Sequence, residues 1–445
     1  MRMNYIAPGI IGIIIVIMLC VLTDETQAVP SYARQTNLPC NSCHTIFPEL
    51  KEFGRLFKLN GYTLTGIRFI ESESGQKQVN LKLSSISPLS AMVQSSFTHF
   101  DKTLPRTQNN DVSFPQYLSF FVAGEITPRI GTFIRVTYTD KTASFYWDNT
   151  DIRFADHLKV ASKDLIYGVT LNNNPTVQDV WNSTPVWGFP YLYSSIAPVP
   201  VSTLIQNGLA RQVAGLGGYI FYDRKIYGEF TMYRSARQGG PHPPDGSSTG
   251  IIKNVSPYWR LALQHQWSDQ YLEIGTYGLY SQIYPQGIAG STNKYTDIAF
   301  DAQYDHVWGN TYLTAHTTYI HEHQNLETSY FDGIVLNRRN NLNTFKIDGN
   351  IYFMQKYAAF LGYFLTSGNE DRILYYPAPI RGSRTRQPDS GGFVAQFDFL
   401  PWYNTKFSLQ YTIYTKFNGA SENYDGYGRN ASGNNTLYLL AWLNF

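Results

Sequence analysis

The chain from residue 89 to residue 98 reads LSAMVQSSFT, and its apolar and polar residues alternate with a period of two. One face would hold Leu89, Ala91, Val93 and Phe97, and the other would hold Ser90, Met92, Gln94, Ser96 and Thr98. This alternation is typical of a β-strand that has an apolar environment on one side and a polar environment on the other. The stretch therefore predicts a strand with Met92 on its polar face.

The same alternation recurs to the C-terminus and predicts sixteen strands. Their predicted ranges are 89–98, 116–127, 131–140, 144–154, 164–172, 212–222, 225–234, 256–267, 270–281, 295–306, 309–320, 343–354, 357–366, 390–400, 405–415 and 436–445. Most have about ten residues, the length with which a tilted strand crosses an outer membrane. Connections are short after even-numbered strands and usually long after odd-numbered ones, as in outer-membrane barrels. We therefore expect residues 89–445 to form an all-β, antiparallel transmembrane barrel of about 16 strands in the lipid of a bacterial outer membrane.

Composition agrees with a folded, exported β protein. Of the 445 residues, 43% are hydrophobic, 16% are aromatic and only 15% are charged, which excludes a disordered chain. The net charge of +2 and the absence of like-charge runs give no reason to expect a nucleic-acid partner. One long apolar stretch, 6–22, follows Arg2 and precedes Ala28, so residues 1–28 are predicted to be a signal peptide.

Two cysteines remain after residue 28, in the string Cys40-Asn41-Ser42-Cys43-His44. The spacing CxxCH is the attachment motif of c-type haem, in which two thiols add to the haem vinyl groups and the adjacent histidine binds the iron. A zinc site usually needs four ligands, and the sequence has no second CxxC. The motif therefore predicts one covalent haem c.

The haem-bearing segment, 29–88, is near the lower size limit for an independent core. Leu50, Phe53, Leu56 and Phe57 have helical spacing, with Pro48 near the helix start. A single short helix needs something to pack against. We therefore expect a short α-helical haem plug inside the barrel or at its periplasmic mouth.

The sixth ligand of the haem iron is a second question. Met92 is the first candidate, because its side chain should point into the lumen and a thioether ligand raises the haem potential. Met354, His99 and an open sixth position are the alternatives. Arg34 and Arg55 are candidate partners of the haem propionates, and solvated surface positions are the alternative for both.

By strand parity, many inward-facing side chains are acidic. The inward carboxylates are Glu125, Glu229, Glu273, Asp297, Asp301, Asp305, Asp348 and Asp398, and they oppose Arg135, Arg260, Lys346 and Lys406. One interpretation is a route for cations toward the haem. The other is mutual support with a basic plug, whose charged residues are Arg34, Lys51, Arg55, Lys58, Arg68, Lys77, Lys82, Glu49, Glu52, Glu71 and Glu73.

Two outer features complete the candidate sites. His316, His321 and His323 are a candidate metal cluster near an outer loop, for which a solvated polar loop is the alternative. The longest connection contains 172–182 and 187–190, and it could fold inward to constrict the pore.

An exported single-haem motif joined to such a barrel resembles the outer-membrane monohaem cytochrome–porin fusions of iron-oxidising bacteria. The resemblance covers nearly all of the chain after residue 28, including 30–36, 53–55, 60–63, 172–182 and 439–445. It implies oxidation of extracellular Fe(II), with the electron passed through one haem to a periplasmic c-type cytochrome or another acceptor. The protein would then be an oxidoreductase, Fe(II):cytochrome c, with no catalytic residue beyond the haem.

Two other functions fit the same residues. One is a haem-containing electron conduit for a different extracellular donor or acceptor. The other is a diffusion porin whose haem plug is structural.

Overall fold

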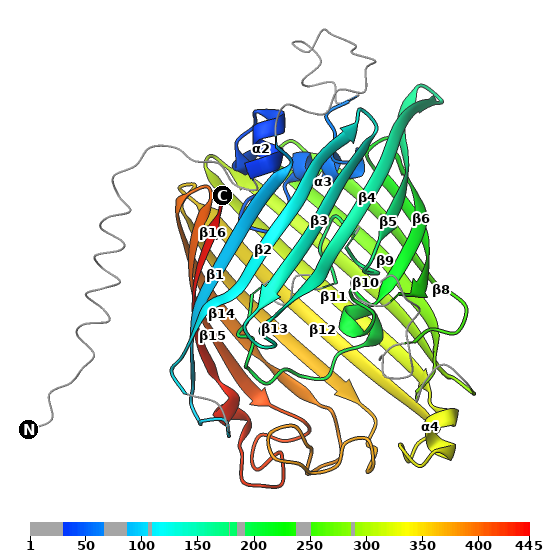
Figure 1. Cartoon of the computed structure of the whole chain (residues 1–445), viewed down its shortest axis with the longest axis vertical. Helices are drawn as coiled ribbons and strands as arrows, with labels where there is room; N and C mark the ends of the chain where they lie inside the picture. Colours follow the sequence, from blue (N-terminus) through cyan, green and yellow to red (C-terminus); the bar gives the residue numbers. More distant parts are fainter. Residues whose placement is uncertain are drawn as a thin grey trace, which may run out of the picture.

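The computed structural model describes residues 30–65, 87–105, 109–177, 179–184, 192–236, 251–285 and 290–445. Within these residues, sixteen antiparallel strands form one closed barrel, in which each strand pairs with its neighbours in sequence and β1 pairs with β16 (Figure 1). Every predicted strand is present, so the all-β barrel and its strand number are confirmed. The predicted signal peptide, 1–28, lies outside the described residues.

The elements have the following bounds. The strands are β1 (Leu89–Phe100), β2 (Asp111–Thr127), β3 (Ile130–Thr139), β4 (Ser144–Val160), β5 (Lys163–Asn172), β6 (Val213–Tyr222), β7 (Ile226–Ser235), β8 (Ser256–Trp267), β9 (Gln270–Ile283), β10 (Asn293–Trp308), β11 (Thr311–Asn325), β12 (Arg339–Phe353), β13 (Tyr357–Gly368), β14 (Ser390–Trp402), β15 (Thr405–Lys416) and β16 (Thr436–Asn444). The helical elements are α2 (Pro30–Thr36), η2 (Cys40–Ser42), α3 (Glu52–Leu59), η3 (Leu204–Gly208), α4 (Glu327–Phe331) and η4 (Ala431–Asn434). Among the described residues, no helix has the length and apolar character needed to span a membrane.

The two ends of the barrel differ. Figure 1 shows α2, α3 and the C-terminus at the end where even-numbered strands turn into the next strand within a few residues. Helix α4 and the long connections lie at the opposite end. Short turns face the periplasm in outer-membrane barrels, so α2 and α3 lie at the periplasmic mouth.

The two faces of the barrel wall follow the predicted parity. On β6 and β7, Leu216, Ile220, Phe230 and Met232 point outward and are about half exposed, whereas the alternate Tyr227 is buried inside. A closed sheet has no unpaired strand edge. Its apolar outer face suits contact with lipid acyl chains. Met232 therefore faces the lipid side, as parity predicted.

One strand end was predicted wrongly. Met354 was expected to point into the lumen from the end of a strand, but β12 ends at Phe353 and Met354 is 70% exposed in the following turn. Met354 and Gln355 both have positive φ, 52° and 55°, which a tight two-residue hairpin turn requires. Methionine and glutamine do not indicate such a turn, so the apolar and polar alternation predicts a strand that continues to residue 354. Met354 is excluded as an inward ligand.

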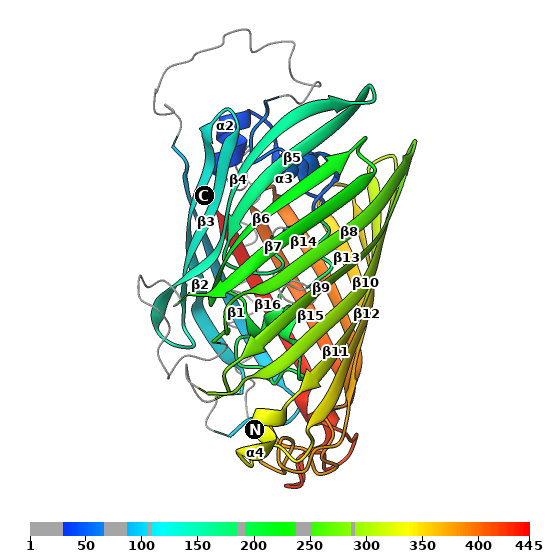
Figure 2. The ribbon, with the colours of Figure 1, turned by 90° about the vertical axis from the view of Figure 1, so that its right-hand side faces the viewer.

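The N-terminal segment, defined here as residues 30–65, lies inside the periplasmic mouth (Figure 2). Its hydrogen-bonding partners come from strands all around the wall. Lys406 of β15 donates to the Phe47 carbonyl at 3.1 Å, and Asn350 of β12 donates to Glu49 at 2.8 Å. Tyr62 donates to Asp151 of β4 at 2.7 Å. A segment with partners on opposite strands occupies the lumen; residues 66–86 of the predicted plug lie outside the described residues.

The long connection between β5 and β6 also enters the lumen, as predicted. We call its described residues, 173–177, 179–184 and 192–212, the inward loop. Thr318 of β11 donates to the Ser183 carbonyl at 3.0 Å, and Gln410 of β15 donates to the Leu192 carbonyl at 3.0 Å. Trp181 is 2% exposed. The inward loop therefore reduces the free cross-section of the barrel; 187–190 lie outside the described residues.

Candidate functional site

The CxxCH motif forms a tight turn at the periplasmic mouth. Residues Cys40–Ser42 make one 3₁₀ turn, and the amides of Cys43 and His44 both donate to the Cys40 carbonyl, at 3.1 and 2.9 Å. Cys40, Cys43 and His44 all line one cavity. No disulfide joins Cys40 to Cys43. Burial raises the pKa of the Cys43 thiol to about 12, so that this group is a neutral thiol near pH 7.

Helix α3 packs directly on this turn. The Lys51 amide, just before the helix, donates to the Cys43 carbonyl at 2.8 Å. A Cβ atom on Gly54 would lie 2.3 Å from the same carbonyl oxygen, closer than any real contact. Glycine at 54 therefore allows α3 to approach the motif, which explains why a helix of only eight residues can hold the turn in place.

The His44 ring is held with one nitrogen available. Its Nδ1 lies 3.1 Å from the Glu49 carbonyl oxygen, which can only accept, so Nδ1 carries the proton. Burial lowers the pKa of His44 to about 4, and the ring is therefore neutral near pH 7. Nε2 then has a lone pair. Metal-binding histidines are commonly oriented in this way, by a backbone carbonyl on the other nitrogen.

The cavity that these groups line has a volume of about 160 Å³ and is largely apolar. Its apolar wall comes from both the N-terminal segment and the barrel, and consists of Tyr32, Phe47, Phe53, Phe57, Tyr62, Met92, Phe121, Phe133 and Trp442. We call it the apolar cavity. Its donor set of two thiols, one imidazole nitrogen and one thioether, within aromatic walls, fits a c-type haem. Cys40 and Cys43 would hold the porphyrin, and His44 would bind its iron.

Met92 lies where parity placed it. Its side chain is 1% exposed, lines the apolar cavity and packs with Phe121 and Trp442. The Gln94 amide donates to the Met92 sulfur at 3.7 Å, which orients the thioether. His99, the other candidate on this strand, hydrogen-bonds to Asn110 at the opposite end of β1. Of the candidate sixth ligands, Met92 is thus the one that lines the cavity.

The two arginines proposed for the propionates do not line the apolar cavity. Arg34 is exposed and donates to the Leu89 carbonyl at 2.5 Å. Arg55 is 4% exposed, forms an ion pair with Asp305 of β10 at 3.2 Å and lies over the Tyr271 ring. In contrast, Lys58 and Arg135 do line the cavity. Sequence reasoning missed both, although Arg135 was assigned to the inner face.

Lys58 joins the N-terminal segment to the inward loop. Its Nζ donates to the Val177 carbonyl at 2.5 Å and to the Asp179 carbonyl at 3.3 Å. Burial, with Arg153 nearby, lowers the pKa of Lys58 to about 8. A negatively charged group in the apolar cavity would favour its protonated form.

The predicted histidine cluster does not form. His316 points inward and pairs with Asp348 at 3.1 Å, whereas His321 and His323 lie on the outward face and bond to Asn343 and Asn341. The side-chain period of a strand puts residues 316 and 321 on opposite faces. Throughout the described part of the chain, no group of three or more His, Cys, Asp or Glu side chains could hold a metal ion.

Most of the inward carboxylates pair with other groups of the protein. Arg260 contacts Asp301 at 2.6 Å, Glu273 at 3.1 Å and Asp179 of the inward loop at 3.7 Å. All three of these carboxylates are nearly inaccessible. Asp305 pairs with Arg55, which confirms the interpretation of mutual support at this position. Glu125 is an exception, since it is exposed at the rim.

No protein-family model matches the sequence, and a comparison with curated proteins also finds no match. Several solved structures are similar to this chain over most of their length. An outer membrane protein of Vibrio cholerae, OmpT, is 11% identical with a TM-score of 0.43, covering 80% of this chain and 96% of that one. The outer membrane channel DcaP of Acinetobacter baumannii is 10% identical with a TM-score of 0.45, covering 80% and 96%. An anion-selective porin from Comamonas acidovorans is 9% identical with a TM-score of 0.45, covering 80% and 98%.

Proposed function

We propose that this protein is an outer-membrane c-type cytochrome that oxidises extracellular Fe(II) and passes the electron to a periplasmic acceptor, such as a c-type cytochrome. The observation that carries the proposal is the apolar cavity. There the thiols of Cys40 and Cys43, the available Nε2 of His44 and the sulfur of Met92 line one space at the periplasmic mouth. A diffusion porin needs none of these groups.

The residues around the cavity have distinct roles. The Glu49 carbonyl fixes the His44 tautomer, and the Gln94 amide orients Met92. The aromatic wall excludes water, which lowers the reorganisation that accompanies a change of charge. Lys58 and Arg135, which also line the cavity, would supply positive charge for the haem propionates. The bound haem would supply a one-electron couple, and the choice of axial ligands sets its potential.

The two ends of the barrel would separate the proposed donor and acceptor. The long connections lie at the end where Fe(II) would be supplied, and the motif lies at the opposite end. Fe(III) precipitates near neutral pH, so a supply of Fe(II) from the outer end would keep the iron out of the cell. Outer-sphere electron transfer requires proximity and a suitable potential, and it needs no acid, base or nucleophile from the protein.

The test is anaerobic mixing of the oxidised, haem-loaded protein with Fe(II), followed by the α band of reduced haem. We expect fast reduction, close to one haem per Fe(II). Reduction by dithionite with none by Fe(II) would overturn the iron proposal and point to a conduit for another donor. Passage of solutes through the protein in liposomes, without haem turnover, would instead point to a diffusion porin.

A further inference from the structure

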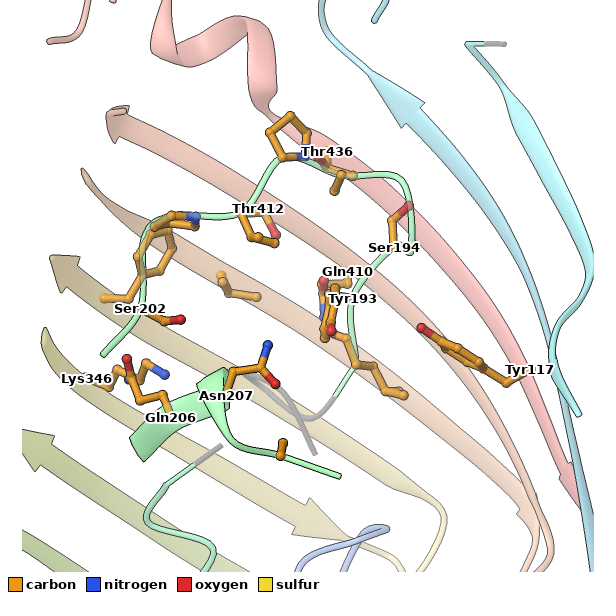
Figure 3. A pocket seen from close by; sticks show the side chains of 18 of the residues that line it. Tyr117, Tyr193, Ser194, Ser202, Gln206, Asn207, Lys346, Gln410, Thr412 and Thr436 are labelled. Atoms are coloured by element: carbon orange, nitrogen blue, oxygen red, sulfur yellow. The ribbon is translucent and has the colours of Figure 1, made fainter. Parts of the chain in front are cut away.

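A second cavity, of about 310 Å³, lies in the middle of the lumen. Figure 3 shows the inward loop passing around it, with Tyr193, Ser194, Gln206 and Asn207 on the loop side, and Lys346 and Gln410 on the barrel wall. We call it the polar cavity. Hydrogen bonds fix its rim, because Tyr414 donates to the Pro198 carbonyl at 3.0 Å and Gln410 to the Leu192 carbonyl at 3.0 Å. It is therefore a built site whose loop side is fastened to the wall.

The polar cavity is positively charged. The charged residues among its described lining are Arg135, Arg211, Lys346 and Asp148. Asp148 lies between the two arginines, 3.2 Å from Arg135 and 3.7 Å from Arg211. Asp348, which interacts electrostatically with Lys346, also pairs with His316 at 3.1 Å and does not line the cavity. The lining itself thus carries three cations and one carboxylate.

The remaining polar groups of the lining are suited to an organic anion. The side-chain amides of Gln206 and Asn207 lie on the loop side of the cavity, and tyrosine rings, among them Tyr117 and Tyr193, also line it. Guanidinium groups bind carboxylates with two parallel hydrogen bonds, a geometry that a single surface lysine does not provide. A volume at the lower end of the usual range for small-molecule sites suits a compact ligand.

The two cavities are neighbours. Pro48, Arg135 and Trp442 line both of them. Gln94 lines the polar cavity and donates to the sulfur of Met92, which lines the apolar cavity. A ligand in the polar cavity would thus lie against side chains that also line the apolar cavity.

We propose that the polar cavity binds a small organic polycarboxylate, of the kind that chelates iron. The step from this site to the function rests on the function proposed above: the donor would enter the lumen as an anionic Fe(II)–polycarboxylate chelate. Hydrated Fe(II) is a dication, and the positive field of the cavity would lower its local concentration. A chelate with net negative charge would be concentrated there by the same field.

Binding is measured without turnover, by isothermal titration of the full-length, haem-loaded protein in detergent. The probes are citrate, its redox-inert Mg(II) chelate and the neutral trimethyl ester of citrate. We expect citrate and Mg(II)–citrate to bind and the ester not to bind. Citrate and Mg(II)–citrate distinguish the free acid from the chelate. If citrate binds and Mg(II)–citrate does not, the cavity is still an anion site, but the proposal that a chelate is the electron donor is overturned.

Variants then locate the binding. Arg211→Gln and Lys346→Gln should each weaken citrate binding about tenfold, the effect of losing one charge-assisted hydrogen bond. Arg211→Lys should recover part of the loss. Arg372→Gln is the matched control, because Arg372 is exposed, pairs with Glu370 and does not line the cavity. A heat-modifiable gel shift checks that each barrel is folded.

The outcomes separate the two proposals. No citrate binding at millimolar concentration, or equal binding in wild type and in both glutamine variants, would overturn the polycarboxylate site. Reduction of the haem by hydrated Fe(II) but not by Fe(II)–citrate would also overturn the chelate as donor, while the proposed iron oxidation stands. Citrate binding in a protein that no form of Fe(II) reduces would retain the site and overturn the function.

Discussion

The N-terminal segment and the inward loop both occupy the lumen, but their chemistry differs. The inward loop meets the wall at a buried cluster in which Asp179, Asp301 and Glu273 share one cation, Arg260. The N-terminal segment and the wall together line an apolar cavity, with Cys40, Cys43 and His44 among the lining residues. The comparison teaches that charged groups of the protein hold the loop at this cluster, whereas the N-terminal segment brings two cysteines and a histidine to an apolar space that the proposed haem would fill.

The largest expected effect on the N-terminal segment comes from removing its two thiols. Cys40→Ser combined with Cys43→Ser should abolish covalent haem altogether, because no other cysteine among the described residues could form the thioethers. The barrel should still close, since its sixteen strand pairs do not involve the motif. Haem staining of a denaturing gel measures attachment, and the heat-modifiable gel shift measures closure. Haem staining that persists in the double variant would contradict a c-type site.

The second prediction concerns the inward loop. Arg260→Met should lower the free energy of unfolding by about 3 to 5 kcal/mol, because it leaves the buried Asp179, Glu273 and Asp301 without their shared cation. Urea unfolding in lipid vesicles provides the measurement. Haem content should stay normal if the two regions are independent.

Lys356→Met is the control for this variant, because Lys356 is exposed in the turn between β12 and β13. An equal loss of stability in both variants would show that the buried cluster has no special role. Loss of haem in Arg260→Met alone would show that the loop supports the motif, in which case the contacts of Lys58 with Val177 and Asp179 are the route.

Met92→Leu should have the smallest effect on stability. It should nevertheless change the haem potential. The two side chains have similar volumes, so the free energy of unfolding should change by less than about 1.5 kcal/mol. The haem potential should fall, because a thioether ligand raises it. The sulfur-to-iron charge-transfer band of the oxidised protein should disappear. The same change at Met232, on the lipid face, should alter neither property; an unchanged potential in Met92→Leu would exclude Met92 as the sixth ligand.

Most of the barrel could be predicted from the sequence, because the period of two marks every strand that has lipid on one side. Strand ends were less predictable. β2 begins at Asp111 and β4 continues to Val160, beyond their predicted limits of 116 and 154. The turn at Met354 was missed for the same reason, since hydrogen bonding and backbone dihedrals decide where a strand ends, and apolar alternation reports only burial.

The candidate site was predictable in part. A local motif identifies Cys40, Cys43 and His44, and strand parity correctly turned Met92 inward. The basic residues of the lining were not predictable, because only the fold brings Lys58 and Arg135 to the same cavity. Arg55 has the charge that a propionate partner needs, but its position on α3 directs its side chain to Asp305. Contacts between segments far apart in sequence leave no signature in either segment alone.

The position of the N-terminal segment inside a closed sheet has a consequence for biogenesis. The segment precedes β1 in the chain, and the barrel closes only when β1 pairs with β16. Residues such as Tyr62 and Arg55 are by then bonded to the inner wall. If the proposed cofactor is correct, we expect its attachment to precede insertion of the barrel into the membrane, and a cell that lacks haem ligation should accumulate closed, colourless barrels.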